Sequence, residues 1–213
     1  MDERVALKRL AEAVERTTRA GTVRLAGAIF PMSQEASADV EMRIEGAADL
    51  TAGRALLTMH LVDEESHEPR TVLHDGAKIR LHVEGDTWLS IPAGSGGIDP
   101  FAMLDLLGGA VATTQASLEP GRTHQRKHNV TIVLDQAIDR ARDPDALRRW
   151  LVDTDVSGTI DACVWLDAAE RIERVLLELP APASHSGDLP ATHVDIHFTD
   201  HGAPIDLPAR VDT

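Results

Sequence analysis

The amino-acid sequence predicts an α+β fold with one antiparallel sheet, and three observations lead to this prediction. Most of the chain alternates apolar and polar residues with a period of two, which is typical of half-buried strands. The strand-like segments follow one another without intervening helices, as in an antiparallel meander rather than a doubly wound sheet. No linker and no internal repeat divides the chain, so we expect residues 1–213 to form a single domain.

Helix signals occur at three places. Over residues 3–20, apolar residues recur at the spacing of one helix face until Gly21 ends the pattern. The pairs Asp99-Pro100 and Asp143-Pro144 each provide an N-cap and a proline suited to the first turn of a helix. The sequence therefore predicts an N-terminal amphipathic helix and two further helices inserted in the meander.

Alternating residues predict about nine or ten strands in the remaining sequence. Asp75 and Gly76 separate two of them and are a strong signal for a tight β-hairpin. The predicted strands lie near residues 39–45, 54–61, 71–73, 79–83, 88–91, 113–118, 123–134, 159–166, 172–179 and 193–199.

Composition disfavours several classes of function. The formal net charge is -14, from 21 Lys and Arg against 35 Asp and Glu, which opposes binding to phosphate backbones and anionic membranes. Aromatic residues make up only 3%, so stacking platforms for nucleic-acid bases are not expected. No apolar stretch approaches the ~18 residues of a membrane-spanning helix. We therefore expect no nucleic-acid partner and no membrane span.

The first residues give an expectation about location. They lack a basic segment followed by an apolar one, so neither a signal peptide nor a lipobox is expected in the sequence as given. At face value this indicates a cytoplasmic location. Cys163 is the single cysteine, which precludes an internal disulfide.

A hydrolase site at Ser95 is the least favoured functional hypothesis. Ser95 lies in a Gly-rich stretch between a predicted strand and a predicted helix, as the nucleophile of many hydrolases does. However, Ala93 stands where that motif has its first glycine, and the helix begins only at Asp99. We interpret the stretch as a connector and expect no enzymatic activity.

A metal site near the C-terminal end is also disfavoured. His193, Asp195 and His197 share one face of a predicted strand, and imidazole with carboxylate is a ligand set for transition metals. Residues four apart on a strand lie about 13 Å from one another, too far to bind one ion. We expect no metal and no other cofactor.

Several segments together resemble the LppX/LprG-type actinobacterial lipoproteins, which belong to the wider LolA-like lipoprotein-carrier fold. The resemblance covers about residues 4–208 and rests on element order and turn residues rather than on a compact motif. The segments that carry it are GRALLTMHLV, WLSIP, DPFAMLDLLGGA, VWLDAAERIERVLLEL and VDIHFTDHGAPIDLP.

The resemblance implies an open half-barrel, with a curved antiparallel sheet whose concave face carries the helices and an apolar cavity. It also implies export, anchoring through a lipidated N-terminal cysteine, and binding of lipids or glycolipids. This sequence departs from that pattern, because Cys163 lies deep in the chain and no lipobox is present. A location in the cell envelope is therefore expected only if the given sequence is a trimmed form.

The favoured hypothesis is that the protein binds or carries a hydrophobic ligand, namely a lipid, a glycolipid or the acyl chain of a lipoprotein. About ten buried methylenes at about 0.8 kcal/mol each supply about 8 kcal/mol before entropic costs. The alternative is that the same aliphatic side chains fill the interior and that the sheet serves as a protein-interaction module.

The phase of alternation selects the residues expected to contact the ligand. On the strands they are Val40, Met42, Ile44, Leu57, Met59, Ile79, Leu81, Ile132, Leu134, Val164, Leu177, Val194, Ile196 and Phe198. On a helix expected to act as a lid they are Phe101, Met103, Leu104 and Leu107.

Overall fold

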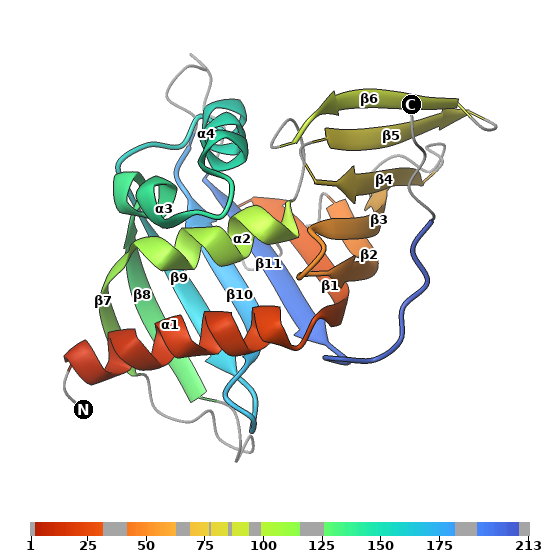
Figure 1. The fold of residues 1–213 in the computed structure, drawn as a ribbon. Coiled ribbons are helices and arrows are strands. Elements are labelled where there is room, and N and C mark those ends of the chain that lie inside the picture. Colours follow the sequence, from red (N-terminus) through yellow and green to blue (C-terminus); the bar gives the residue numbers. More distant parts are fainter. Residues whose placement is uncertain are drawn as a thin grey trace.

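The computed structural model describes residues 3–31, 42–62, 69–76, 78–84, 87–93, 99–115, 126–181 and 191–208. Within these residues the chain forms one antiparallel sheet of eleven strands and four α-helices (Figure 1). The helices are α1 (Glu3–Arg19), α2 (Pro100–Leu106), α3 (Leu134–Arg140) and α4 (Pro144–Asp153), and a short 3₁₀-helix η1 (Leu107–Gly109) follows α2. The strands are β1 (Thr22–Pro31), β2 (Met42–Asp49), β3 (Arg54–Leu61), β4 (Arg70–Asp75), β5 (Lys78–Glu84), β6 (Thr87–Pro92), β7 (Ala110–Gln115), β8 (Arg126–Val133), β9 (Thr159–Leu166), β10 (Ile172–Leu179) and β11 (Thr192–Thr199).

The sheet is open, with two edges. Its strand order is β6-β5-β4-β3-β2-β1-β11-β10-β9-β8-β7, and β6 and β7 form the edges. Neighbours in the sheet are neighbours in the sequence except where β1 pairs with β11, which joins the two ends of the meander. The α+β class and the open antiparallel sheet predicted from the sequence are confirmed.

The helices cover one part of the sheet and leave another part free. Figure 1 shows α1, α2 and α3 in front of the strands β7–β11, while β4, β5 and β6 lie to the side of these helices. Helix α1 packs on β7 and β10, and α3 packs on β8 and η1. We call β7–β11 the covered half, β2–β6 the wing, and the side on which the helices lie the inner face.

Two glycines lie on the inner face between the covered half and the wing. Gly27 of β1 and Gly46 of β2 occupy positions in phase with buried aliphatic residues of the same strands. A Cβ atom at Gly27 would lie 2.6 Å from the carbonyl oxygen of Asp195, and one at Gly46 would collide with that of Leu56. Because only glycine permits so close an approach of two backbones, we infer that these positions let the sheet bend here.

The structure differs from the sequence prediction at two elements. Strand β1 was not predicted, because Gly27 interrupts the apolar alternation of Val23, Leu25 and Ile29. Leu134 does not continue strand β8 but begins α3, in which Leu134 and Ala137 are buried at helical spacing. Leu134 continues the apolar alternation of the strand residues before it, which is why the sequence predicted it on the sheet. That placement was wrong.

An ion-pair cluster holds α1 against the turn between β9 and β10. Glu170 of this turn accepts a hydrogen bond from Arg16 of α1 at 2.9 Å, and Arg9 lies 3.6 Å from the same carboxylate. Arg126 of β8 also contacts Glu170. Burial acts to raise the pKa of Glu170, but the hydrogen bond from Arg16 and the charges of Arg9 and Arg126 outweigh it and hold that pKa below its ordinary value.

This cluster gives a pH-dependent contribution to stability. The pKa of Glu170 is lower in the folded protein than in the unfolded chain. The cluster therefore stabilises the fold fully at pH values above the pKa of Glu170 in the unfolded chain, and this stabilisation is lost as the pH falls through its pKa in the folded protein. We expect Glu170→Gln to lower the free energy of unfolding by about 1 kcal/mol at neutral pH and by much less in acid, where Glu170 is itself neutral. Urea unfolding of the wild type and of Glu170→Gln, at neutral pH and in acid, measures this loss of stability. The same loss at both pH values would contradict the prediction.

Candidate ligand-binding site

Most residues predicted to contact a ligand lie in the hydrophobic core. Their side chains are at most 3% exposed and belong to one cluster that joins the inner face of the sheet to the helices. They are Ile44, Leu57, Ile79, Met103, Leu104, Leu107, Ile132, Val164, Leu177, Val194, Ile196 and Phe198. Leu134, now at the start of α3, is also buried in this cluster. The covered half therefore has an apolar interior that is densely lined by its own side chains.

Four other predicted residues are only partly buried, namely Phe101 of α2 and three residues of the wing. Met42, Met59 and Leu81 occupy inner-face positions of β2, β3 and β5 and pack against the core cluster from its edge. Val40 lies outside the described residues. The predicted residues thus divide into a buried set, which includes Ile44, Leu57 and Ile79 of the wing, and an accessible set at the edge of the core cluster.

Sequence reasoning missed further residues of the accessible set. Ile29 of β1 and Ile91 of β6 are partly buried against the same cluster, and Leu89 of β6 is 53% exposed. Strand pairing places Ile29 opposite Met42 and Leu89 opposite Leu81. Leu89 and Ile91 flank Ser90 two residues apart in the predicted strand, which was a usable signal that they share a face. We call the accessible set the apolar strip, and it consists of Ile29, Met42, Met59, Leu81, Leu89 and Ile91.

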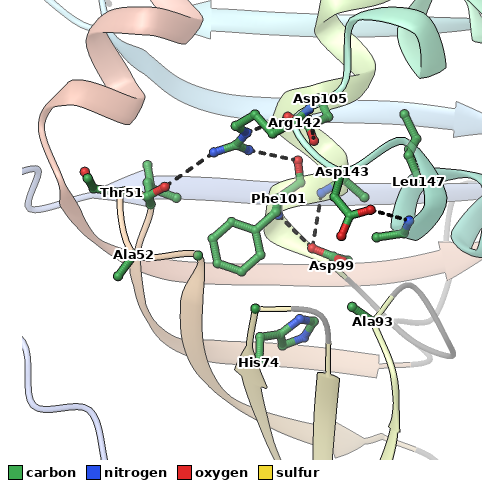
Figure 2. A pocket seen from close by; sticks show the side chains of 15 residues that line it. Thr51, Ala52, His74, Ala93, Asp99, Phe101, Asp105, Arg142, Asp143 and Leu147 are labelled. Atoms are coloured by element: carbon green, nitrogen blue, oxygen red, sulfur yellow. Dashed lines mark hydrogen bonds and ion pairs between the residues drawn. The ribbon is translucent and has the colours of Figure 1, made fainter. Parts of the chain in front are cut away.

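Two pockets border the helices. The first, of about 580 Å³, lies between α1 and the α2–η1 segment, and the predicted lid residues Leu104 and Leu107 line it. The second, of about 310 Å³, lies between α2, α4 and the turns that join β2 to β3 and β4 to β5, and Phe101 lines it. We call the second the end pocket, and Figure 2 shows its side chains.

Arg142 holds the helices around the end pocket. Its guanidinium donates to a carboxylate oxygen of Asp105 at 2.7 Å and to the backbone oxygen of Phe101 at 3.3 Å. Its second terminal nitrogen donates to the backbone oxygen of Leu50 at 3.4 Å. Burial raises the pKa of Asp105, and Arg142 acts in the opposite direction by its charge and its hydrogen bonds. The loop before α4 is thereby tied to α2 and to the end of β2.

The sequence predicted both helix caps at this pocket correctly. One carboxylate oxygen of Asp99 accepts hydrogen bonds from the backbone N–H groups of Phe101 and Ala102 at 2.8 and 3.1 Å. One carboxylate oxygen of Asp143 accepts from the N–H of Ala146 at 2.9 Å. Both caps line the end pocket, so its rim is built from the N-termini of α2 and α4.

His74 is the one imidazole of the end-pocket lining. It lies on the inner face of β4, is only 3% exposed, and meets the Phe101 ring edge-on with 6.0 Å between centroids. Burial lowers the pKa of His74, while the charge of Asp99 acts to raise it. We therefore expect a neutral imidazole at neutral pH.

The hypotheses of a metal site and a Ser95 hydrolase concern other parts of the chain. On the outer face of β11, both carboxylate oxygens of Asp195 accept hydrogen bonds from Arg174 at 2.8 Å. His197 lies 3.6 Å from Asp195, and His193 packs on the Phe30 ring. Ser95 lies outside the described residues.

In the described part of the chain, no helix is both long enough and apolar enough to cross a membrane. No protein-family model matches the sequence. No curated protein matches it either.

Two solved structures share the fold over nearly the full chain. The lipoprotein LppX of Mycobacterium tuberculosis superposes with a TM-score of 0.61 at 13% identity, covering 97% of this chain and all of LppX. LprF of Mycobacterium bovis superposes with a TM-score of 0.55 at 14% identity, covering 97% of each chain. The resemblance expected from the sequence is confirmed at the level of the fold. The chain has the open, helix-covered antiparallel sheet of the mycobacterial lipoproteins LppX and LprF.

Proposed function

We propose that the protein is a non-enzymatic binder or carrier of a lipid, a glycolipid or a lipoprotein acyl chain, and that the chain of this ligand lies on the apolar strip. The observation that carries the proposal is the contrast along the inner face of one sheet. In the core cluster, which extends to Ile44, Leu57 and Ile79 of the wing, its aliphatic side chains are buried, whereas the apolar strip continues the same face with partly exposed side chains.

The strip has the properties that an acyl-chain site needs. Its residues are aliphatic, and two of them are methionines, whose flexible side chains adapt to chains of different shape. Covering about ten methylenes contributes about 8 kcal/mol before entropic costs, which is enough for micromolar affinity without any polar contact. The fold shared with LppX and LprF supports a carrier role, as the resemblance seen in the sequence implied.

Native mass spectrometry tests the proposal. We expect protein purified without detergent to carry an added mass that organic extraction removes and that mass spectrometry of the extract identifies as a lipid. The extracted protein should then bind dodecanol, a neutral single-chain alcohol, in titration calorimetry. A ligand-free mass together with no heat of dodecanol binding would contradict the proposal.

The interaction-module hypothesis retains a specific observation in its favour. Strand β6 is an edge of the sheet, and Trp88 and Leu89 on it are 37% and 53% exposed, as is Val83 of β5 at 61%. Exposed edge strands with apolar residues are places where another chain adds to a sheet. Partner binding that depends on these residues and is unchanged by lipid extraction would favour this hypothesis over the carrier.

A further inference from the structure

The end pocket contains two carboxylates that are only half used. The cap hydrogen bonds of Asp99 and Asp143 all go to one carboxylate oxygen, Oδ1. The second oxygen, Oδ2, has no hydrogen bond from a described residue. Asp99 is nonetheless only 5% exposed. Figure 2 shows the two carboxylates directed toward one another across the pocket. Asp143 is partly exposed, and two like charges that face one another, one of them buried, are stabilised by a cation between them.

A second, independent feature of the pocket is the His74 ring. Its side chain is only 3% exposed and lines the pocket, where the ring meets the Phe101 ring and feels the charge of Asp99. In Figure 2 the ring lies beside Asp99 and faces the same space. No described residue forms a hydrogen bond with the ring, so a ligand N–H group in the pocket can donate to its unprotonated nitrogen.

The charges around this pocket nearly balance, but they are unevenly placed. The ion pair of Asp105 with Arg142 is internally balanced, and His74 is expected to be neutral. Asp99 and Asp143 each carry a full negative charge against roughly half a positive charge from the helix end that each one caps. Arg149, whose Nε donates to the backbone oxygen of the lining residue Ala93 at 2.7 Å, adds one positive charge at the rim, so the total is close to zero and the negative charge is concentrated on the two carboxylates.

We propose that the end pocket takes a primary ammonium group, held by the free oxygens of Asp99 and Asp143 and by the imidazole of His74. An ammonium group has three N–H donors, which matches these three acceptors. A pocket of about 310 Å³ lies at the small end of organic-ligand sites and has room for a head group, and carbon from Leu50, Phe101 and Leu147 forms much of its wall. This composition suits an organic amine better than a bare metal ion, which needs a tight cage of oxygens.

Strand register leads from the end pocket to the apolar strip, so we place the amine on an amphiphile. His74 of β4 is in register with Ile79 of β5, and Ile79 is in register with Ile91 of the strip. A chain that leaves the pocket along β5 meets Leu81 next, since residues two apart share a face. The position of the chain rests on the proposed function, whereas the ammonium site itself does not.

Charge-removing substitutions that keep the caps test the ammonium site. Asparagine caps helices as well as aspartate does, so Asp99→Asn with Asp143→Asn preserves the hydrogen bonds to the helix ends and removes both charges. In calorimetry we expect dodecylamine to bind the wild-type protein about tenfold more tightly than dodecanol, and the double variant to lose this preference while it binds dodecanol unchanged. Asp139→Asn, an exposed change on α3, is the matched control and should behave as wild type.

Butylamine distinguishes failure of this site from failure of the proposed function. In amide NMR, millimolar butylamine should shift the cap N–H signals of Phe101, Ala102 and Ala146 in the wild type but not in the double variant. Equal affinity of the wild type for dodecylamine and dodecanol, or butylamine shifts that persist in the variant, would overturn the ammonium site and leave the carrier proposal intact. Butylamine shifts without any dodecanol binding would support the ammonium site and overturn the carrier. Displacement of butylamine by equimolar Ca²⁺ would reassign the pocket to a metal ion.

Discussion

Phe198→Ala is expected to lower the free energy of unfolding by about 3–5 kcal/mol, the ordinary cost of truncating a fully buried phenylalanine. Phe198 of β11 is 0% exposed and belongs to the core cluster beneath the helices. Its removal leaves a cavity that the surrounding strands cannot close, because β11 is paired on both sides. Chemical unfolding with urea measures the change.

Phe30→Ala is the matched control for this change. Phe30 lies on the opposite face of the sheet, is partly exposed, and packs mainly on His193 at 5.2 Å between ring centroids. We expect its truncation to cost about 1 kcal/mol. If Phe198→Ala cost no more than Phe30→Ala, the interior of the covered half would not be packed as described, and a ligand could occupy that space instead of the strip.

The double substitution Met59→Gln with Leu81→Gln is expected to weaken dodecanol binding by about 2 kcal/mol, or about 30-fold, because each apolar side chain contributes about 1 kcal/mol to the contact. Both residues are partly exposed and lie at the edge of the core cluster, so the fold tolerates a polar atom there. Calorimetric titration of the extracted protein measures the affinity.

A substitution on the other face separates this effect from a general loss of stability. Leu176 of β10 is a partly exposed leucine whose phase is opposite to that of the buried Val175 and Leu177. Leu176→Gln should leave dodecanol binding unchanged. Equal weakening by both variants would show that the chain does not lie on the strip.

Much of the fold was predictable because strand alternation and helix caps are local signals. Asp99 and Asp143 were recognised as caps, and they cap α2 and α4 as predicted. Strand β1 was not predicted because its close approach to β11 requires glycine at position 27. At that position an alternating strand pattern would have an apolar side chain. Leu134 was misplaced because a strand that runs directly into a helix keeps its apolar phase for one more residue.

The site was less predictable than the fold for a different reason. Alternation identifies which residues face inward, but the coverage of that face by helices depends on tertiary contacts. Ile44 and Met42 share a strand face, yet Ile44 is in the core and Met42 lies in the strip. The end pocket joins residues from β4, α2 and the loop before α4, and no sequence spacing brings His74, Asp99 and Asp143 together.

Methyl NMR of protein labelled with ¹³C at the methionine methyl groups tests the central claim most directly. Met42 and Met59 lie in the apolar strip, whereas Met103 of α2 is 0% exposed in the core cluster, so one sample contains both the probe and its control. On titration with dodecanol, we expect the methyl signals of Met42 and Met59 to shift together and that of Met103 to stay in place. A shift of Met103 alone, or no shift at any of the three, would contradict binding of the acyl chain on the strip.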